Sequence, residues 1–250
     1  MHGELLTSDQ LPANFITSVR DQSRADAEAA EERRKGSGLF TASELHKLLT
    51  SKAAPSKGAT ARAYICEKAW ERLTGARVDK GTGFRETEWG NEWEGYAIEQ
   101  FSKASGLSVE YTGKKQRFQK ADGYPFGATP DGLIGSDAIC EVKCPFNGGI
   151  HLQNIRFGKD LDWFRSERFE YYVQIQGVLW ASDRKTGYFI SYDPGMSRER
   201  DADERMMFEG YPEHLRLFYA TIPRDESFID ILKSVVVEAE KELQAILADK

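Results

Sequence analysis

The sequence has little of what marks membrane proteins, secreted proteins and zinc sites. It contains only three cysteines, Cys66, Cys140 and Cys144, without a Cys-x-x-Cys pair, which excludes a disulfide framework and a four-cysteine zinc site. No run reaches the roughly 18 consecutive apolar residues of a membrane span, and the N-terminus lacks the basic and then apolar layout of a secretory signal. We therefore expect reduced thiols, a cytoplasmic location and no membrane partner.

Motifs for several kinds of chemistry are also missing. The four histidines are scattered without the spacing of metal ligands, and His151 is expected to lie in a loop. The sequence has neither a glycine-rich phosphate loop nor a Gly-x-Ser-x-Gly elbow. These absences argue against histidine metal sites, P-loops and serine hydrolases.

The charge balance is slightly acidic, with 34 basic and 40 acidic residues and a net charge of −6. Taken alone, this balance argues mildly against a nucleic-acid partner, because phosphate binding depends on positive charge. The charges are uneven, however. Acidic residues gather in 21–32 and after Asp201, while Arg33-Arg34-Lys35 and Lys114-Lys115-Gln116-Arg117 are basic. A negative total is compatible with an enzyme that holds a metal ion with carboxylates.

Hydrophobic periodicity is helical before Gly106 and becomes strand-like after it. Helices are expected over Pro12–Lys35, from Thr41 or Ser43 onward, and over Thr60–Leu73, Glu88–Lys103, Tyr171–Ser182 and Phe228–Leu247. Strands are expected over Ser108–Thr112, Gln116–Gln119, Ala138–Cys144 and Thr186–Tyr192. This order predicts an α/β fold with a small mixed β-sheet flanked by helices. We expect one domain, 1–250, with a helical part to about 106, a sheet core from about 107 to 195 and a C-terminal helix over about 225–248.

The stretch with most chemical information is Gly-Ala-Thr-Pro-Asp-Gly-Leu-Ile at 127–134, followed ten residues after Asp131 by Glu141-Val142-Lys143. Side chains alternate between faces along a strand, so Glu141 and Lys143 should point together into a cleft, while Val142 and the flanking cysteines face the core. Asp131 follows a proline and precedes a glycine, which places it at an irregular strand end where its carboxylate can converge on Glu141.

Such a cluster is suited to a hard cation. Two carboxylates and a backbone carbonyl, most naturally that of Val142, offer only oxygen ligands, which favour Mg²⁺ with Mn²⁺ as a substitute. Lys143 can orient the attacking water or help to deprotonate it, and can offset charge on a phosphoryl group. Since a metal ion acidifies water and acts as a Lewis acid, the pattern indicates phosphodiester hydrolysis. A chance Pro-Asp-Gly turn and a Glu-x-Lys ion pair give the same letters, so the surrounding sequence has to decide.

Three further segments accompany the Thr-Pro-Asp-Gly-Leu and Glu-x-Lys-Cys-Pro-Phe runs. They are Gly38-Leu39-Phe40-Thr41-Ala42-Ser43-Glu44, Trp89-Gly90 with Trp93-Glu94, and Tyr171-Tyr172-Val173-Gln174-Ile175-Gln176. In content and order, over roughly residues 35 to 195, they resemble the phage lambda exonuclease family, also called YqaJ-like viral recombinases or alkaline exonucleases. The resemblance implies a restriction-endonuclease-like fold with a PD-(D/E)xK core.

The resemblance also implies a role for each residue of the predicted centre. Asp131, Glu141 and the Val142 carbonyl would bind the metal, and Lys143 would be catalytic. Glu94 would reach the metal through its water shell, although it could also be a solvated acid beside neighbouring glutamates.

Other segments of the resemblance imply contacts around the metal and with DNA. Gln174, with Tyr171, would position the water or the lysine. Ser43 would contact the terminal phosphate of the substrate, unless its hydroxyl serves only to cap a helix. Spacing leaves the basic phosphate contacts open among Arg33, Arg34 and Lys35 on one side and Lys52, Lys57 and Arg62 on the other. The predicted set of DNA- and phosphate-binding residues contains Ser43, Arg34, Lys35, Arg62 and Tyr171.

The function implied by the resemblance is a 5′-to-3′ exonuclease on double-stranded DNA ends, with 5′-phosphorylated ends expected. Such an enzyme works in phage-type single-strand annealing recombination, as a homotrimer, with a single-strand annealing protein as partner. Two alternatives stay open: an endonuclease or junction resolvase on the same fold, and a non-catalytic DNA-binding protein. An iron–sulfur nuclease is set aside, because that cluster usually requires four cysteines.

Overall fold

The main sheet has four strands and carries the segments singled out above. The computed structural model describes residues 27–28, 31, 35–78, 85–199 and 201–249, so most of the helix predicted over Pro12–Lys35, including Arg33 and Arg34, lies outside the described residues. The strands are β4 (Gly132–Ile134), β5 (Ala138–Lys143), β6 (Thr186–Tyr192) and β7 (Leu217–Pro223), in the order β4-β5-β6-β7. Within this sheet β5 and β6 run parallel, while β4 with β5 and β6 with β7 are antiparallel.

A parallel pair needs a crossover connection, and here it is made of three helices. These are α4 (Gly148–Phe157), α5 (Leu161–Glu167) and α6 (Phe169–Ser182). A smaller sheet, in the order β1-β3-β2, consists of β1 (Phe40–Thr41), β2 (Gln119–Lys120) and β3 (Phe126–Ala128). The small mixed sheets flanked by helices have the restriction-endonuclease-like PD-(D/E)xK architecture expected from the sequence.

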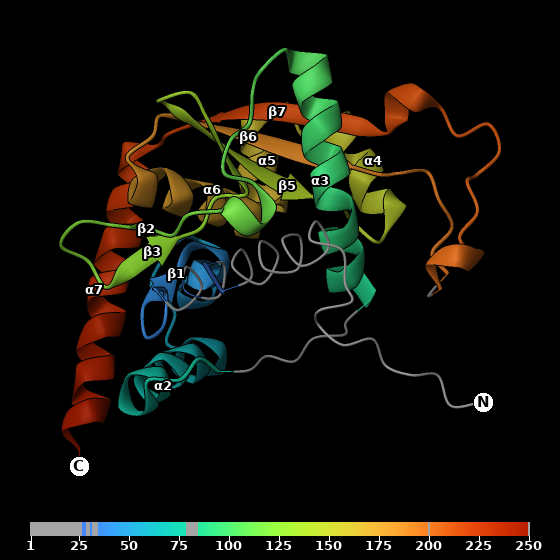
Figure 1. Ribbon diagram of the computed structural model, residues 1–250. Coiled ribbons are helices and arrows are strands. Elements are labelled where there is room, and N and C mark those ends of the chain that lie inside the picture. The colour runs from blue at the N-terminus through green and yellow to red at the C-terminus, as the bar shows by residue number, and fades with distance from the viewer. Residues whose placement is uncertain (1–26, 29–30, 32–34, 79–84, 200, 250) are drawn as a thin grey trace, which may run out of the picture.

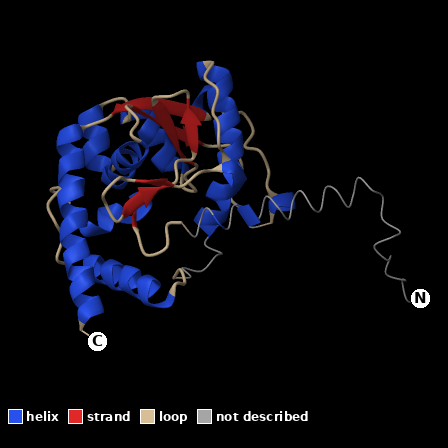
Figure 2. Ribbon diagram, turned by 60° about the vertical axis from the view of Figure 1, so that its left-hand side comes forward, coloured by secondary structure: helices blue, strands red, loops and turns tan. Residues whose placement is uncertain are grey.

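Helices cover both faces of the main sheet, as Figures 1 and 2 show. Helix α3 (Arg85–Ser105) packs on β5, β6 and β7, and α6 packs on β5 and β6 from the other face. The 3-10 helix η2 (Ala42–Leu48) packs against α6. Helix α7 (Glu226–Ala248) runs along one side, with α2 (Ala59–Thr74) against it. None of the helices in the described part of the chain is both long and apolar enough to span a bilayer.

The two faces of β5 pack into two separate cores, which explains why every residue from Ala138 to Val142 is buried. Ile139 packs in a core with Phe189 of β6 and with residues of α6 and α7. Cys140 and Val142 pack in a second core with residues of α3. Strand alternation therefore sends neighbouring side chains of β5 to opposite layers.

The N-terminal elements confirm much of the expected pattern. Helix α2 ends at Gly75 with a φ of 69°, the left-handed cap that its glycine predicts. Near Thr41 the chain forms the 3-10 helix η2, and Thr41 at its cap position makes no side-chain capping hydrogen bond within the described residues.

Three expectations for the middle of the chain are wrong. The run 108–112 is not a strand: it makes one bridge, Glu110 with Leu133, and Tyr111 then adopts a φ of 56°, which ends extended pairing. The run 116–119 is largely loop, with only Gln119 in β2. His151 is not a loop residue but lies buried in α4, between Ser191 Oγ at 2.8 Å and the Leu215 carbonyl at 2.7 Å. The sequence patterns above do not predict helices α4 and α5 or strand β7.

Candidate active site

Asp131 is placed by the turn that leads into β4. The antiparallel register pairs Gly132 with Cys140, so Asp131, one residue earlier, lies opposite Glu141. Its Oδ2 atom accepts the Val142 N–H at 2.7 Å. A Cβ at Gly132 would lie 2.3 Å from Val109 Cγ1 and 3.0 Å from Cys140 Sγ, so only glycine permits this close approach.

Glu141 and Lys143 share one face of β5, as strand alternation predicts. Lys143 Nζ lies 2.7 Å from Glu141 Oε1, and the Glu141 side chain is only 1% exposed. Val142 and the two flanking cysteines point into the other core. The predicted division into a charged face and an apolar face is confirmed.

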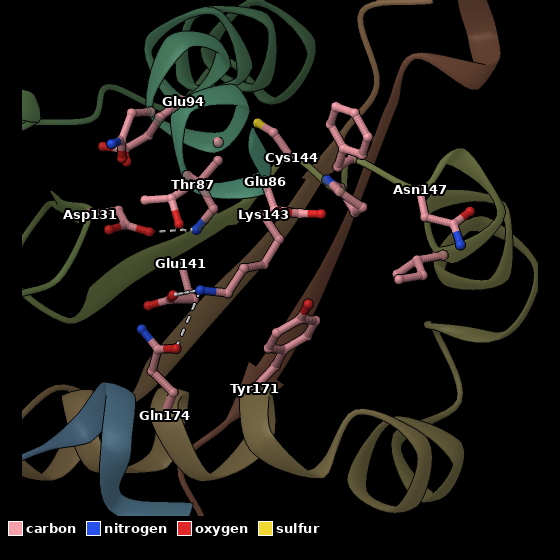
Figure 3. Close-up of a pocket in the computed structure, with 16 residues that line it drawn as sticks. Glu86, Thr87, Glu94, Asp131, Glu141, Lys143, Cys144, Asn147, Tyr171 and Gln174 are labelled. Carbon is pink, nitrogen blue, oxygen red and sulfur yellow. Dashed lines mark hydrogen bonds and ion pairs between the residues drawn. The ribbon is translucent and has the colours of Figure 1, made fainter. Parts of the chain in front are cut away.

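Helix α6 supplies two side chains from across the cavity. Gln174 Oε1 accepts from Lys143 Nζ at 3.3 Å, and the ring of Tyr171 lies 5.3 Å from the same nitrogen. The two residues are one helical turn apart, so they face the same way from an otherwise buried helix. Figure 3 shows the Lys143 side chain reaching across the cavity with its tip between Glu141 and Gln174.

Glu94 comes from α3, on the side of the cavity opposite α6. Trp89, Ala97 and Phe101 anchor that helix in the core, and Glu94 is left half-buried at the edge of the packed face. Its Oε1 atom accepts from Gln116 Nε2 at 3.3 Å.

These side chains line one cavity of about 470 Å³. Of the predicted residues, its lining includes Glu94, Asp131, Glu141, Val142, Lys143, Tyr171 and Gln174. It also includes Glu86, Thr87, Asn91, Phe146 and Asn147, which the sequence reasoning missed. Asn91 could have been found from helical spacing, because it precedes Glu94 by one turn; for the others we see no signal.

Of the predicted DNA and phosphate contacts in the described part of the chain, Tyr171 lines this cavity and the others do not. Ser43 is exposed at the start of η2, with its Oγ 3.5 Å from Thr41 Oγ1. Lys35 and Arg62 are also exposed, Arg62 on α2, and of the described residues none of these three is part of the lining. Arg34 lies outside the described residues.

Residues 30–187 match the family model of the YqaJ-like viral recombinase domain. The chain belongs to this family. An alkaline exonuclease from Laribacter hongkongensis is 25% identical, with 89% of this chain and 94% of that chain covered and a TM-score of 0.67. The same enzyme in complex with dAMP gives 25% identity, 88% and 97% coverage and a TM-score of 0.66. A phage-related exonuclease from Haemophilus somnus 129PT, 23% identical over 84% and 96% of the chains, has the same fold with a TM-score of 0.65. A comparison with the curated proteins found no match.

Charge is unbalanced in the cavity of this family member. Burial raises the pKa of Asp131 well above its ordinary value, and the charges of Glu141 and Glu94 raise it further. Burial and then Glu141 likewise raise the pKa of Glu94. Burial alone would lower the pKa of Lys143, but Glu141 and Asp131 hold it above its ordinary value. Three carboxylates thus face one ammonium, which leaves an excess of negative charge for a cation to neutralise.

The donor set fits a hard divalent cation. Glu141 Oε2 is buried and has no hydrogen-bond partner among the described residues, and such an atom is costly unless a ligand satisfies it. Asp131 has a second carboxylate oxygen beside the one that accepts the Val142 N–H. Within the described chain no group of three His, Cys, Asp or Glu side chains forms a complete metal site. Asp131 and Glu141 would therefore share the cation with the Val142 carbonyl and water.

Proposed function

We propose that this chain is a Mg²⁺-dependent exonuclease that degrades one strand of double-stranded DNA in the 5′-to-3′ direction. Membership of an exonuclease family supports the nuclease part of the proposal. The observation that carries it is the meeting of Asp131, Glu141, Lys143 and Gln174 in one cavity, where a buried oxygen of Glu141 has no hydrogen-bond partner among the residues that the structure describes. Mn²⁺ is expected to replace Mg²⁺, since both take oxygen ligands.

The protein's own groups divide the work of hydrolysis. Asp131, Glu141 and the Val142 carbonyl would hold the cation, and Glu94 would reach it through water. When bound, the cation lowers the pKa of water and withdraws electron density from the phosphodiester. The Lys143 ammonium, fixed by Glu141 and Gln174, orients the attacking water and offsets the negative charge that builds on the phosphoryl oxygens.

DNA ends and a recombination role complete the proposal. The Laribacter enzyme has been solved in complex with dAMP, which supports a DNA strand as substrate. Ser43 lies on η2, which packs on the helix that carries Gln174 and Tyr171, and we assign it to the 5′-phosphate. Arg34, Lys35 and Arg62 are the basic candidates for contacts with the same phosphate. A cytoplasmic homotrimer that works with a single-strand annealing protein is part of the same proposal.

Digestion of linear duplex DNA labelled at either end tests the proposal. Mg²⁺ should be required, label should leave the 5′ end first, and 5′-phosphorylated ends should be preferred over 5′-hydroxyl ends. Lys143→Ala should lower the rate about 10²- to 10³-fold or more, with DNA affinity nearly unchanged. Lys185→Ala is the matched control, because this exposed lysine pairs only loosely with Asp137, at 3.3 Å.

Other outcomes would favour the competing functions. Nicking of a covalently closed plasmid would indicate an endonuclease, and salt-dependent binding without product would indicate a DNA-binding protein. Full activity of Lys143→Ala would refute the assignment of the lysine. A mass measurement that finds only monomer at working concentration would remove the trimer.

A further inference from the structure

A basic segment beside the candidate site has no role in the function proposed so far. Residues 112–121 contain Lys114, Lys115, Arg117 and Lys120 and no acidic residue, although the whole chain has a net charge of −6. Lys114 and Lys115 are exposed, in the short 3-10 helix η3 (Gly113–Lys115). The Arg117 guanidinium lies over the exposed ring of Tyr111, 6.0 Å from its centre.

This segment forms one wall of a second cavity, which adjoins the first across Glu94. The second cavity has a volume of about 730 Å³ and lies between the outward side of α3 and residues 112–116. Asn91 and Glu94 line both cavities. The 3.3 Å hydrogen bond from Gln116 to Glu94 ties the basic segment to an acid of the candidate metal site. A nucleic-acid strand that leaves the first cavity past Glu94 therefore enters the second cavity.

Gly95 leaves the backbone of α3 bare inside this second cavity. Glycine within a helix is less favourable than alanine. No atom of the described chain lies within 4 Å of the position that a Gly95 Cβ would take, and the same is true of Gly90 in the first cavity. Packing within the described part of the chain therefore gives no reason for the missing side chain, whereas close approach of a ligand to the backbone does.

Three glutamates of α3 line this cavity, and two of them pair with a cation. Glu92 forms an ion pair with Arg205, and Glu99 lies 2.6 Å from Lys103 Nζ. Glu94 accepts from Gln116. The cations beside Glu92 and Glu99 weaken the repulsion that an anion meets there, and Lys114 adds a positive charge to the lining of the cavity.

We propose that the second cavity and the basic segment bind the sugar–phosphate backbone of the nucleic-acid substrate next to the cleavage site. Lys114, Lys115 and Arg117 contact successive phosphates, and Gly95 lets the strand lie against α3. The inference rests on the proposed function, because it takes a nucleic acid as the substrate. It adds a binding surface that the chemistry of hydrolysis does not require.

Equilibrium binding in EDTA tests this surface without any need for hydrolysis. A fluorescein-labelled duplex is titrated with the wild type, with the triple variant Lys114→Gln/Lys115→Gln/Arg117→Gln, and with Gly95→Leu, at salt concentrations from about 50 to 200 mM. The matched control is Lys159→Gln/Lys185→Gln/Lys241→Gln, which removes the same charge from exposed lysines that line neither cavity.

The triple variant should bind at least about tenfold more weakly, and the slope of log affinity against log salt should shrink by about 2 to 3, as for three lost phosphate contacts. Gly95→Leu should bind about tenfold more weakly while its melting temperature stays the same or rises, because leucine favours a helix more than glycine does.

Three results overturn the proposal: a triple variant within twofold of the wild type, an equal loss in the control variant, or a more stable Gly95→Leu protein with unchanged binding. A wild type that binds the duplex without cutting it in Mg²⁺ overturns the proposed activity alone. A wild type that binds no DNA overturns both.

Discussion

Replacing Asp131 with Asn should stabilise the protein when no divalent cation is present and abolish the stabilisation that Mg²⁺ gives the wild type. Burial and the charges of Glu141 and Glu94 raise the pKa of Asp131, so the folded state binds this proton more tightly than the unfolded state does. The free energy of unfolding therefore falls as pH rises from the ordinary pKa of an aspartate through the raised one. An asparagine at this position cannot ionise, yet its side-chain oxygen can still accept the Val142 N–H.

The magnitude follows from linkage. Each unit by which the pKa is raised contributes about 1.4 kcal/mol to the difference between the two variants above the raised pKa. Mg²⁺ at about 100 times its dissociation constant stabilises the folded wild type by about 2.7 kcal/mol. For a chain of this size, 1 kcal/mol shifts the melting temperature by about 2 to 4 °C, so the wild type should gain about 5 to 10 °C. Asp131→Asn should gain little, because a neutral amide is a poor ligand for Mg²⁺.

Thermal unfolding followed by circular dichroism, in EDTA and in a Mg²⁺ titration at several pH values, measures both effects. Asp137→Asn serves as the control, because Asp137 is exposed and lies outside the cavity. An unchanged Mg²⁺ shift in Asp131→Asn would show that Asp131 is not a ligand. A lower melting temperature of this variant in EDTA would show that the electrostatic reasoning is wrong.

Two further predictions concern the buried ion pair of α2 and the three cysteine thiols. Lys68 Nζ lies 2.9 Å from Glu71 Oε2 with both side chains 1% exposed. Lys68→Ala should lower the free energy of unfolding in urea by about 3 to 5 kcal/mol, because the buried carboxylate loses its paired cation. A loss below about 1 kcal/mol would contradict this. Burial raises the pKa of the Cys140 thiol and that of Cys144, the latter to about 12, while Cys66 is exposed. Ellman's reagent should therefore modify only Cys66 in the native protein at pH 8 and all three thiols in denaturant, and rapid reaction of a second native thiol would count against this.

Local pattern was sufficient to predict the charged face of β5. Alternation along one strand decides that Glu141 and Lys143 point together, and it needs no knowledge of the rest of the fold. The approach of Asp131 to Glu141 was also predictable, because a Pro-Asp-Gly turn leads into β4. Glu94 and Gln174 were different: helical periodicity marked their helices, but only the family resemblance connected those helices with the strand.

Features that depend on distant contacts could not be predicted. The sequences of β5 and β6 do not reveal that the two strands pair in parallel. A strand buried on both faces has the same hydrophobic pattern whether its neighbour is parallel or antiparallel. The run 108–112 has the composition of a strand, yet the left-handed backbone of Tyr111 and a single bridge to Leu133 end it. His151 looked like a loop residue, because its two buried hydrogen-bond partners, Ser191 and Leu215, come from far along the chain.

The crossover between β5 and β6 also determines at which stage of synthesis the cavity can form. Lys143 and Gln174 are 31 residues apart, and the three crossover helices must fold back before β6 can pair with β5. Long-range parallel pairing forms slowly, because loop-closure entropy is lost before the contacts repay it. A nascent or partly unfolded chain therefore lacks the assembled acid and lysine groups. The cavity that gathers these side chains is therefore complete only when the whole fold has formed.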